Sequence, residues 1–209
     1  MLQNLDNVLF AALNRGAANG FFDWVMPRIT NLHKEPWFAA IVLGLCGWYL
    51  WRGPHRARLW ILCAVVAIGI SDPLARRVIK ELYPRDRPCH TVRPFAHKAN
   101  PDTRLVPGEE CPGSPSFPSN HASNMGALAV VCWWFTHRRI RWLWFLLPLV
   151  IGYSRIYLGY HYPSDVIGGW LLGGLVGAGV ILALRGLVRE SNGQPALPES
   201  APPPDADDN

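Results

Sequence analysis

Apolar residues in this chain are gathered into five long runs, and this clustering constrains the fold more than any other feature of the sequence. The runs cover approximately residues 36–51, 59–79, 122–135, 140–157 and 166–187. A helix that crosses the hydrocarbon core of a bilayer needs about 20 mainly apolar residues, so the first and third runs need their flanks to complete a crossing. We therefore expect an all-α integral membrane protein, a helical bundle of about five transmembrane helices.

The N-terminal segment, residues 1–34, fits this pattern least well. Its apolar residues are interrupted by Asn14, Arg15, Asn19 and Asp23. Charges inside a span are costly, so we interpret the segment as an N-terminal interfacial helix and turn; a sixth, irregular span is the alternative. The segment also lacks the basic start and small-residue cleavage site of a secretory signal, and we expect it to stay on the mature protein.

Arginine clusters set the expected orientation. They follow the first, third and fifth runs: Arg52, Arg56 and Arg58; Arg138, Arg139 and Arg141; Arg185 and Arg189. With five spans all three clusters lie on one side, which the positive-inside rule identifies as the cytoplasm. Residues 35–189 then form one membrane domain, whose external face carries the loop 81–121 and residues 158–165. The polar, proline-rich residues 190–209 are expected to be a disordered cytoplasmic tail.

Two features argue against other classes of function. The net charge is +5, but the basic residues do not form a continuous strip on one predicted element, so we expect no nucleic-acid partner. The sequence also contains no pair of cysteines separated by two residues, which makes a zinc site improbable.

The five cysteines fall into two groups. Cys46, Cys63 and Cys132 lie inside apolar runs, where they are expected to be small buried hydrophobes. Cys89 and Cys111 lie in the polar loop, on the side that the orientation places in an oxidising environment. We predict a disulfide between them, which would close a loop of about twenty residues and stabilise the fold by roughly 3 kcal/mol. Two free surface thiols are the alternative.

Three polar clusters lie at the external ends of the predicted spans. They are Lys80 with Arg87 and Pro88; Pro118, Ser119, Asn120 and His121; and Ser154, Arg155, His161 and Asp165. Each cluster alone has an ordinary explanation. A histidine at a helix start, such as His121, is more often a cap, and Lys80 or Arg87 could be an interfacial anchor. The predicted topology, however, brings all three clusters to one membrane face.

Together the clusters supply what phosphoryl transfer needs. Three cations can neutralise phosphate oxygens, namely Lys80, Arg87 and Arg155. Ser119 and the amides at the start of the third span add donors where a helix dipole favours an anion. One histidine can attack phosphorus while the other protonates the leaving oxygen, and Asp165 can hold His161 in the required tautomer. Because side chains supply the positive charge, we expect no metal and no other cofactor.

Two further features of the spans favour structural interpretations. The glycines of the last run lie in an apolar helix, so they are expected to allow close helix packing and not to bind phosphate. Asp72 lies inside the second run beside Pro73. Pairing with Arg76 or Arg77, or with backbone groups freed by the proline, is favoured over a catalytic role for this carboxylate.

The three clusters resemble the signature motifs of the type 2 phosphatidic acid phosphatase superfamily, and the resemblance covers roughly residues 36–188. The matching patterns are Lys80-x6-Arg87-Pro88, Pro118-Ser119-Asn120-His121 and Ser154-Arg155-x5-His161-x3-Asp165. The resemblance implies that His161 is the nucleophile, Asp165 its orienting partner, and His121 first the acid and then the base that activates water. It implies that phosphoryl oxygens are held by Lys80, Arg87, Ser119, Arg155 and the backbone near Asn120. Asn120 departs from the family, which usually has Gly there; Asn tolerates unusual backbone angles, so we expect activity with an altered oxyanion contact.

The resemblance thus implies an undecaprenyl-diphosphatase-like lipid phosphatase in the bacterial cytoplasmic (inner) membrane, multi-pass, with its active site facing the periplasm or exterior. Its partners would be the bilayer and a lipid phosphate. Undecaprenyl diphosphate is the favoured substrate, because an external site suits carrier recycling; phosphatidylglycerol phosphate and lipid A phosphate are the alternatives. A non-enzymatic lipid transporter could use the same cations but needs no pair of histidines. A vanadate-dependent haloperoxidase would have a similar pocket, but those enzymes are soluble. Oligomeric state does not follow from these patterns.

Overall fold

The computed structural model describes residues 2–90, 103–184 and 186–187, and the regular structure of this part of the chain is helical. The expected all-α architecture is confirmed. The elements are α1 (Leu2–Arg15), α2 (Gly20–Asn31), η1 (Leu32–Lys34), α3 (Pro36–Arg52), α4 (His55–Pro73), η2 (Leu74–Ile79), α5 (Lys80–Leu82), α6 (Asn120–Phe135), η3 (Arg141–Phe145), α7 (Leu146–Tyr157) and α8 (Pro163–Ala183). The predicted tail, residues 190–209, lies outside the described residues, as do Arg185 and Arg189.

Each of the five apolar runs forms a helix, but the helices differ in length. Among the described residues, two stretches are long and apolar enough to cross a membrane, His55–Leu82 and Pro163–Ala183. The helices α3, α6 and α7 have 17, 16 and 12 residues, which is less than the roughly 20 that a crossing requires. The helix count alone therefore does not establish how many times the chain spans a bilayer.

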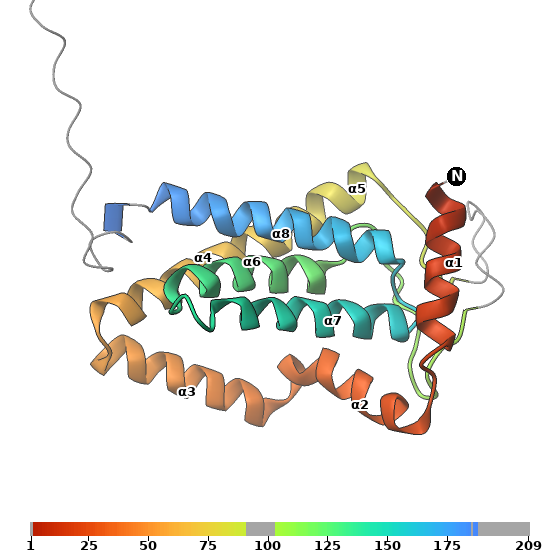
Figure 1. Cartoon of the computed structure of the whole chain (residues 1–209), viewed down its shortest axis with the longest axis horizontal. Helices are drawn as coiled ribbons and strands as arrows, with labels where there is room; N and C mark the ends of the chain where they lie inside the picture. Colours follow the sequence, from red (N-terminus) through yellow and green to blue (C-terminus); the bar gives the residue numbers. More distant parts are fainter. Residues whose placement is uncertain (1, 91–102, 185, 188–209) are drawn as a thin grey trace, which may run out of the picture.

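The long helices run side by side as a bundle, and α6 lies at its centre against α4, α7 and α8 (Figure 1). Glycines of α8 allow this close packing. A Cβ atom on Gly173 would lie 1.8 Å from the Ser123 carbonyl oxygen of α6, and one on Gly177 would lie 2.7 Å from the Ala127 carbonyl oxygen. The backbones of α6 and α8 are thus in direct contact, as expected for small residues between membrane helices.

One apolar core cluster occupies the half of the bundle away from the polar clusters. Two further apolar clusters, one around Tyr157 and one around Phe10, lie at the end that carries the polar clusters. The first cluster is formed by α4, α6 and α8 and contains Cys63 and Cys132, which are free thiols, as expected. Cys46, in contrast, is partly exposed on α3, because this helix lies at the edge of the bundle (Figure 1).

Pro73 ends the regular part of α4, since proline has no N–H and its ring clashes with the preceding turn. The chain continues as a π-helical segment, η2, and a short α5 that carries Lys80. Asp72 lies beside this change, 3.9 Å from Nε of Arg76, and accepts a hydrogen bond of 3.1 Å from the Asn124 amide of α6. The contact with Arg76 is one of the structural pairings that the sequence favours over a catalytic role for Asp72.

The N-terminal segment consists of two short helices. Helix α1 crosses the end of the bundle at which α8 begins (Figure 1). Its buried Asn14 amide donates to the carbonyl oxygens of Arg104, Ile156 and Tyr157, at 3.0, 3.2 and 2.8 Å. Helix α1 is therefore held to the end of α7 and to the loop before α6.

Candidate functional site

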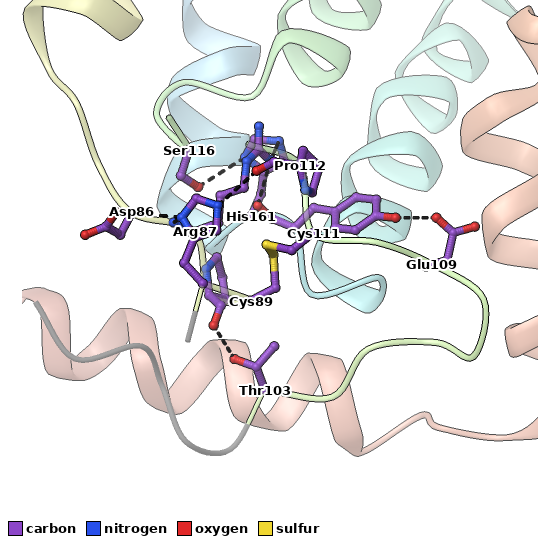
Figure 2. Close-up of a disulfide and its surroundings, with 12 residues drawn as sticks. Asp86, Arg87, Cys89, Thr103, Glu109, Cys111, Pro112, Ser116 and His161 are labelled. Atoms are coloured by element: carbon purple, nitrogen blue, oxygen red, sulfur yellow. Dashed lines mark hydrogen bonds and ion pairs between the residues drawn. A yellow bond between two sulfur atoms is a disulfide. The ribbon is translucent and has the colours of Figure 1, made fainter. Parts of the chain in front are cut away.

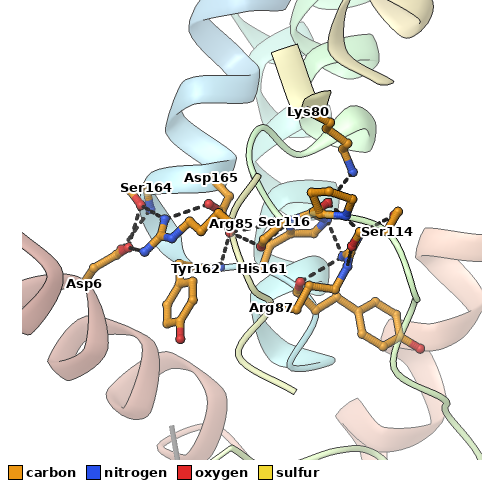
Figure 3. Close-up of polar contacts among 12 residues, drawn as sticks. Asp6, Lys80, Arg85, Arg87, Ser114, Ser116, His161, Tyr162, Ser164 and Asp165 are labelled. Atoms are coloured by element: carbon orange, nitrogen blue, oxygen red, sulfur yellow. Dashed lines mark hydrogen bonds and ion pairs between the residues drawn. The ribbon is translucent and has the colours of Figure 1, made fainter. Parts of the chain in front are cut away.

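The three polar clusters of the sequence meet at one end of the bundle, where α5 and α7 end and where α6 and α8 begin. Figure 3 shows Lys80, Arg87, His161 and Asp165 in this region, with Ser114 and Ser116 of the connecting loop between them. All four motif residues are buried. Burial of so many charged groups requires mutual pairing or hydrogen bonds, and the contacts around His161 show how these are made.

His161 lies between a cation and an anion, with only 2% of its surface exposed. Its Nε2 atom accepts a hydrogen bond of 3.0 Å from Nη1 of Arg87. On the other side of the ring, Nδ1 is 3.6 Å from Oδ2 of Asp165. This distance exceeds a direct hydrogen bond, but catalytic contacts are often long without substrate. The ring thus directs Nδ1 to the carboxylate and Nε2 to the cations.

The protonation state of His161 follows from this environment. Burial lowers the pKa of His161 from 6.5 to about 3; Asp165 opposes this change and Arg87 reinforces it. The imidazole is therefore neutral at neutral pH. A neutral ring with its proton on Nδ1 has a free electron pair on Nε2, which is the state that a nucleophile needs.

Asp165 is fixed through both of its oxygens. Oδ2 accepts a hydrogen bond of 2.8 Å from the backbone N–H of Tyr162 and another from the Ser116 hydroxyl. Oδ1 accepts a hydrogen bond of 2.7 Å from Arg85. The carboxylate therefore cannot rotate freely, and Oδ2 stays directed toward His161.

Two of the expected cations are anchored on the loop before α6. Nε of Arg87 donates to the Ser114 carbonyl oxygen at 2.7 Å, and Nζ of Lys80 donates to the Pro115 carbonyl oxygen at 2.7 Å. Burial lowers the pKa of Arg87 to about 10, so its guanidinium remains charged at neutral pH. Carbonyl groups of the loop thus hold both Arg87 and Lys80 in the buried site.

Arg155 reaches the site from α7. Nη1 donates to the Thr30 hydroxyl at 3.1 Å, and the guanidinium lies 4.7 Å from the ring centroid of Tyr160, a cation–π distance. Its Nε atom has no hydrogen-bond partner among the residues that the structure describes. Arg155 therefore retains donor capacity for an anion.

The start of α6 carries further polar atoms without partners. Within the described parts of the chain, the Ser119 hydroxyl, Oδ1 of Asn120 and Nε2 of His121 are buried and unpaired. The His121 ring packs against His33, with ring centroids 5.3 Å apart, and Arg155 and His161 lie within electrostatic range of it. Buried polar groups without partners are rare and costly, so this end of α6 is suited to a polar ligand.

The Asn120 side chain contacts α4. Its amide donates to Oδ1 of Asp72 at 3.4 Å. The expectation that the backbone near Asn120 holds a phosphoryl oxygen stays a prediction.

Sequence reasoning missed several residues around the site: Thr30, His33, Arg85, Ser114 and Ser116. Arg85 lies between the two basic motif positions, and both serines directly precede the Pro118-Ser119 element. Their proximity to the motifs was the available signal. Thr30 and His33 lie far from every motif in the sequence, and no local pattern marks them.

A disulfide joins Cys89 to Cys111, with Cα atoms 5.7 Å apart (Figure 2). Nearby, the Thr103 hydroxyl donates to the Pro88 carbonyl oxygen at 2.7 Å, and Nε2 of His90 lies 2.9 Å from the Pro112 carbonyl oxygen. The bridge joins the segment just after Arg87 to the segment just before Ser114, whose carbonyl oxygen binds Arg87.

Among the residues that the structure describes, no three His, Cys, Asp or Glu side chains are grouped so that they could hold a metal ion. The positive charges described above come from Lys80, Arg87 and Arg155, and these side chains are the ones available to an anionic ligand.

The chain is similar to known proteins over most of its length. The sequence model of the PAP2 superfamily matches residues 58–189. The lipid A 4'-phosphatase of Bacteroides thetaiotaomicron is 30% identical over 84% of this chain and 75% of its own length. The undecaprenyl-diphosphatase BcrC of Bacillus subtilis is 30% identical over 76% of this chain and 73% of its own. The fold resembles a transmembrane PAP2-type phosphatidylglycerolphosphate phosphatase from Bacillus subtilis, with a TM-score of 0.62 and 24% identity over 88% of this chain and 86% of that one.

Proposed function

Since this chain belongs to the PAP2 superfamily and is a phosphatase, we propose that it hydrolyses a lipid phosphate or diphosphate through a phosphohistidine on His161. The observation that carries the proposal is the position of His161 between Asp165 and Arg87. One ring nitrogen faces a fixed carboxylate, and the other faces the cations that would hold a phosphoryl group.

In the first step, Nε2 of His161 attacks phosphorus. The N–P bond forms as the bond between phosphorus and the leaving oxygen breaks, and His121 gives its proton to that oxygen. In the second step, His121 takes a proton from water, whose oxygen attacks phosphorus. The N–P bond then breaks and phosphate is released. Asp165 keeps the Nδ1 proton in place throughout.

The cations act on the phosphoryl oxygens. Arg87 contacts Nε2 of His161 without substrate, so it is in place to hold an oxygen during in-line attack. Lys80, Arg155, the Ser119 hydroxyl and the backbone near Asn120 would share the remaining charge. Such preorganised donors stabilise charge that develops in the transition state. Nε of Arg155 and the Ser119 hydroxyl have no partner among the described residues, which supports these roles.

Undecaprenyl diphosphate is the substrate that we propose. Related proteins are named for three lipids, namely lipid A, undecaprenyl diphosphate and phosphatidylglycerol phosphate. Sequence similarity alone therefore does not identify the substrate. An external active site suits hydrolysis of a carrier diphosphate. The described residues form one helical bundle, which also fits a substrate that offers little besides its diphosphate.

We further propose five membrane crossings in a bacterial inner membrane, with the site outside. Arg52, Arg56 and Arg58 lie at the end of the bundle opposite the site, and Nη2 of Arg56 donates to the Phe135 carbonyl oxygen at 2.7 Å. That contact brings two arginine-bearing links together, which supports a common cytoplasmic side. Residues 1–34 would lie at the external interface, 35–189 form the phosphatase domain, and 190–209 form a cytoplasmic tail.

Phosphate release from a lipid panel tests the proposal. The purified protein would be given undecaprenyl diphosphate, phosphatidylglycerol phosphate and lipid A separately, with a His161→Ala control. We expect the fastest release from undecaprenyl diphosphate. Faster release from another lipid would reassign the substrate, and release from none of the three would contradict the proposed function.

A further inference from the structure

Arg85 bridges two buried carboxylates, one of them in the proposed catalytic site. Its Nη1 atom donates to Oδ1 of Asp165 at 2.7 Å, and its Nη2 atom donates to Oδ2 of Asp6 at 2.6 Å (Figure 3). Nη1 also donates to the Ser164 hydroxyl at 2.6 Å, and the guanidinium lies 4.2 Å from the ring centroid of Tyr162. A planar guanidinium held on several sides has one orientation.

Asp6 belongs to α1, and it binds Ser164 at the start of α8 as well as Arg85. Its Oδ1 atom accepts a hydrogen bond of 3.0 Å from the backbone N–H of Ser164, and its Oδ2 atom accepts one of 2.5 Å from the Ser164 hydroxyl. Only 6% of Asp6 is exposed. A buried carboxylate at the start of α8 is favourable, because the helix dipole and free N–H groups attract an anion there.

The two contacts have a consequence for Asp165. Its Oδ1 atom is occupied by Arg85, while its Oδ2 atom is held by Ser116 and the Tyr162 amide on the side of His161. Loss of Asp6 would leave Arg85, which is half-buried, with one carboxylate partner and with a neutral partner in Gln3. The guanidinium would then be free to move toward Asp165 and to turn it away from His161.

We propose that Asp6, acting through Arg85, positions Asp165, so that helix α1 is a required part of the catalytic machinery. The inference rests on the proposed role of Asp165. Helix α1 lies before residue 58, where the family match begins, and nothing in the three motifs indicates its participation. Asp6 and Arg85 are positioning residues, since neither contacts the phosphoryl group.

A second ion pair provides a matched control. Asp23 of α2 binds Arg104 at 2.5 Å and also accepts a hydrogen bond of 2.6 Å from the Tyr157 hydroxyl. Arg104, like Arg85, lies in the loop between α5 and α6. This pair likewise joins an N-terminal helix to the loop, but it has no contact with Asp165. A general effect of detaching an N-terminal helix would appear equally in Asp6 and Asp23 variants.

The experiment measures kcat, KM and melting temperature of full-length protein in detergent, with undecaprenyl diphosphate, phosphatidylglycerol phosphate and lipid A offered separately. The variants are Asp6→Asn, Asp6→Ala, Arg85→Gln, Arg85→Lys, the Asp6→Ala/Arg85→Gln double variant and the control Asp23→Asn. Displacement of a catalytic group by about 1 Å can reduce rates roughly 100-fold. We expect Arg85→Gln and Asp6→Ala to lower kcat about 10- to 100-fold with little change in KM, and Arg85→Lys to recover part of the loss.

The double variant separates positioning from mere stability. If Asp6 acts through Arg85, the double variant is no slower than Arg85→Gln alone. Multiplicative losses, or kcat at the wild-type level in the folded Asp6→Asn and Arg85→Gln proteins, would overturn the inference. An equal loss of kcat in Asp23→Asn would also overturn it. Absence of phosphate release by the wild-type protein would instead contradict the proposed function.

Discussion

The chemistry of His161 is set by its immediate neighbours. Burial would leave an isolated imidazole neutral but unoriented, whereas Asp165 and Arg87 assign a different task to each nitrogen. The neutral state matters, because only a ring nitrogen with a free electron pair can attack phosphorus.

His161→Ala should abolish phosphate release while the protein remains folded. The change removes the proposed nucleophile, and the polar site lies away from the apolar core of α4, α6 and α8. His137→Ala is a matched control, because His137 is exposed at the opposite end of the bundle. Turnover and melting temperature in detergent measure the two effects. Wild-type turnover in His161→Ala would rule out the mechanism.

The stability of the protein should depend on pH through His161. The pKa of His161 is about 3 when folded and 6.5 when free of its environment. Between these values the unfolded chain binds more protons, so this contribution to stability is present above about pH 6.5 and is lost as pH falls toward 3. Melting temperatures from pH 7 to 4 should fall less steeply in His161→Gln. Parallel profiles for the two proteins would contradict the pKa assignment.

At the scale of elements, the loop between α5 and α6 connects the basic motifs to the start of α6. Ser114 and Pro115 bind Arg87 and Lys80, and the Cys89–Cys111 disulfide closes the loop a few residues away. The loop thus acts as a scaffold for the cations.

Alkylation followed by mass spectrometry tests this bridge. We expect Cys89 and Cys111 to resist labelling in unfolded, unreduced protein from an oxidising membrane, and to label after reduction. Cys46, Cys63 and Cys132 are free and should label in both conditions, which provides an internal control. Labelling of Cys89 and Cys111 without reductant would show that the bridge is absent and would weaken the external placement of the loop.

The helices could be predicted from the sequence, because long apolar runs indicate helices that are shielded from water. The ends of the helices were harder to predict: the helical stretch that starts with α4 continues past Pro73 as η2 and α5 to Leu82, and α6 begins at Asn120. The proline signals an end to α4, but the π-helical turn compensates for it. Such local adjustments depend on tertiary contacts and leave no periodic signal.

The candidate site also has a part that the sequence predicts and a part that it does not. Motif residues such as Arg87 and His161 could be predicted, because their chemistry and spacing are visible in the sequence. The Asp6 to Arg85 contact could not, since it joins positions 79 residues apart. Only the packing of α1 across the end of the bundle brings these side chains together (Figure 1).

At the scale of the whole molecule, the bundle brings positive charge from three segments to one buried site. Lys80, Arg87 and Arg155 come from α5, the loop and α7, and each is buried. Side-chain cations at one place can perform the charge stabilisation for which many phosphoryl-transfer enzymes use Mg²⁺.

Activity should therefore persist in excess EDTA. Phosphate release from the preferred lipid, measured before and after chelation, checks this expectation. Orthovanadate should inhibit in the same assay, because its trigonal bipyramidal form resembles the transition state of phosphoryl transfer. Activity that disappears with EDTA and returns with Mg²⁺ would count against the assigned site.

The central claim, a phosphohistidine on His161, is tested most directly by trapping it. The His121→Ala protein would be mixed with lipid labelled at its terminal phosphate, quenched rapidly under alkaline conditions and digested. Loss of the base should slow hydrolysis of the intermediate more than its formation when the leaving group is good. The account predicts labelled phosphate on the peptide that contains His161, and no label in the His161→Ala/His121→Ala protein. Label on any other residue, or lipid consumed in a single turnover without labelled protein, would contradict it.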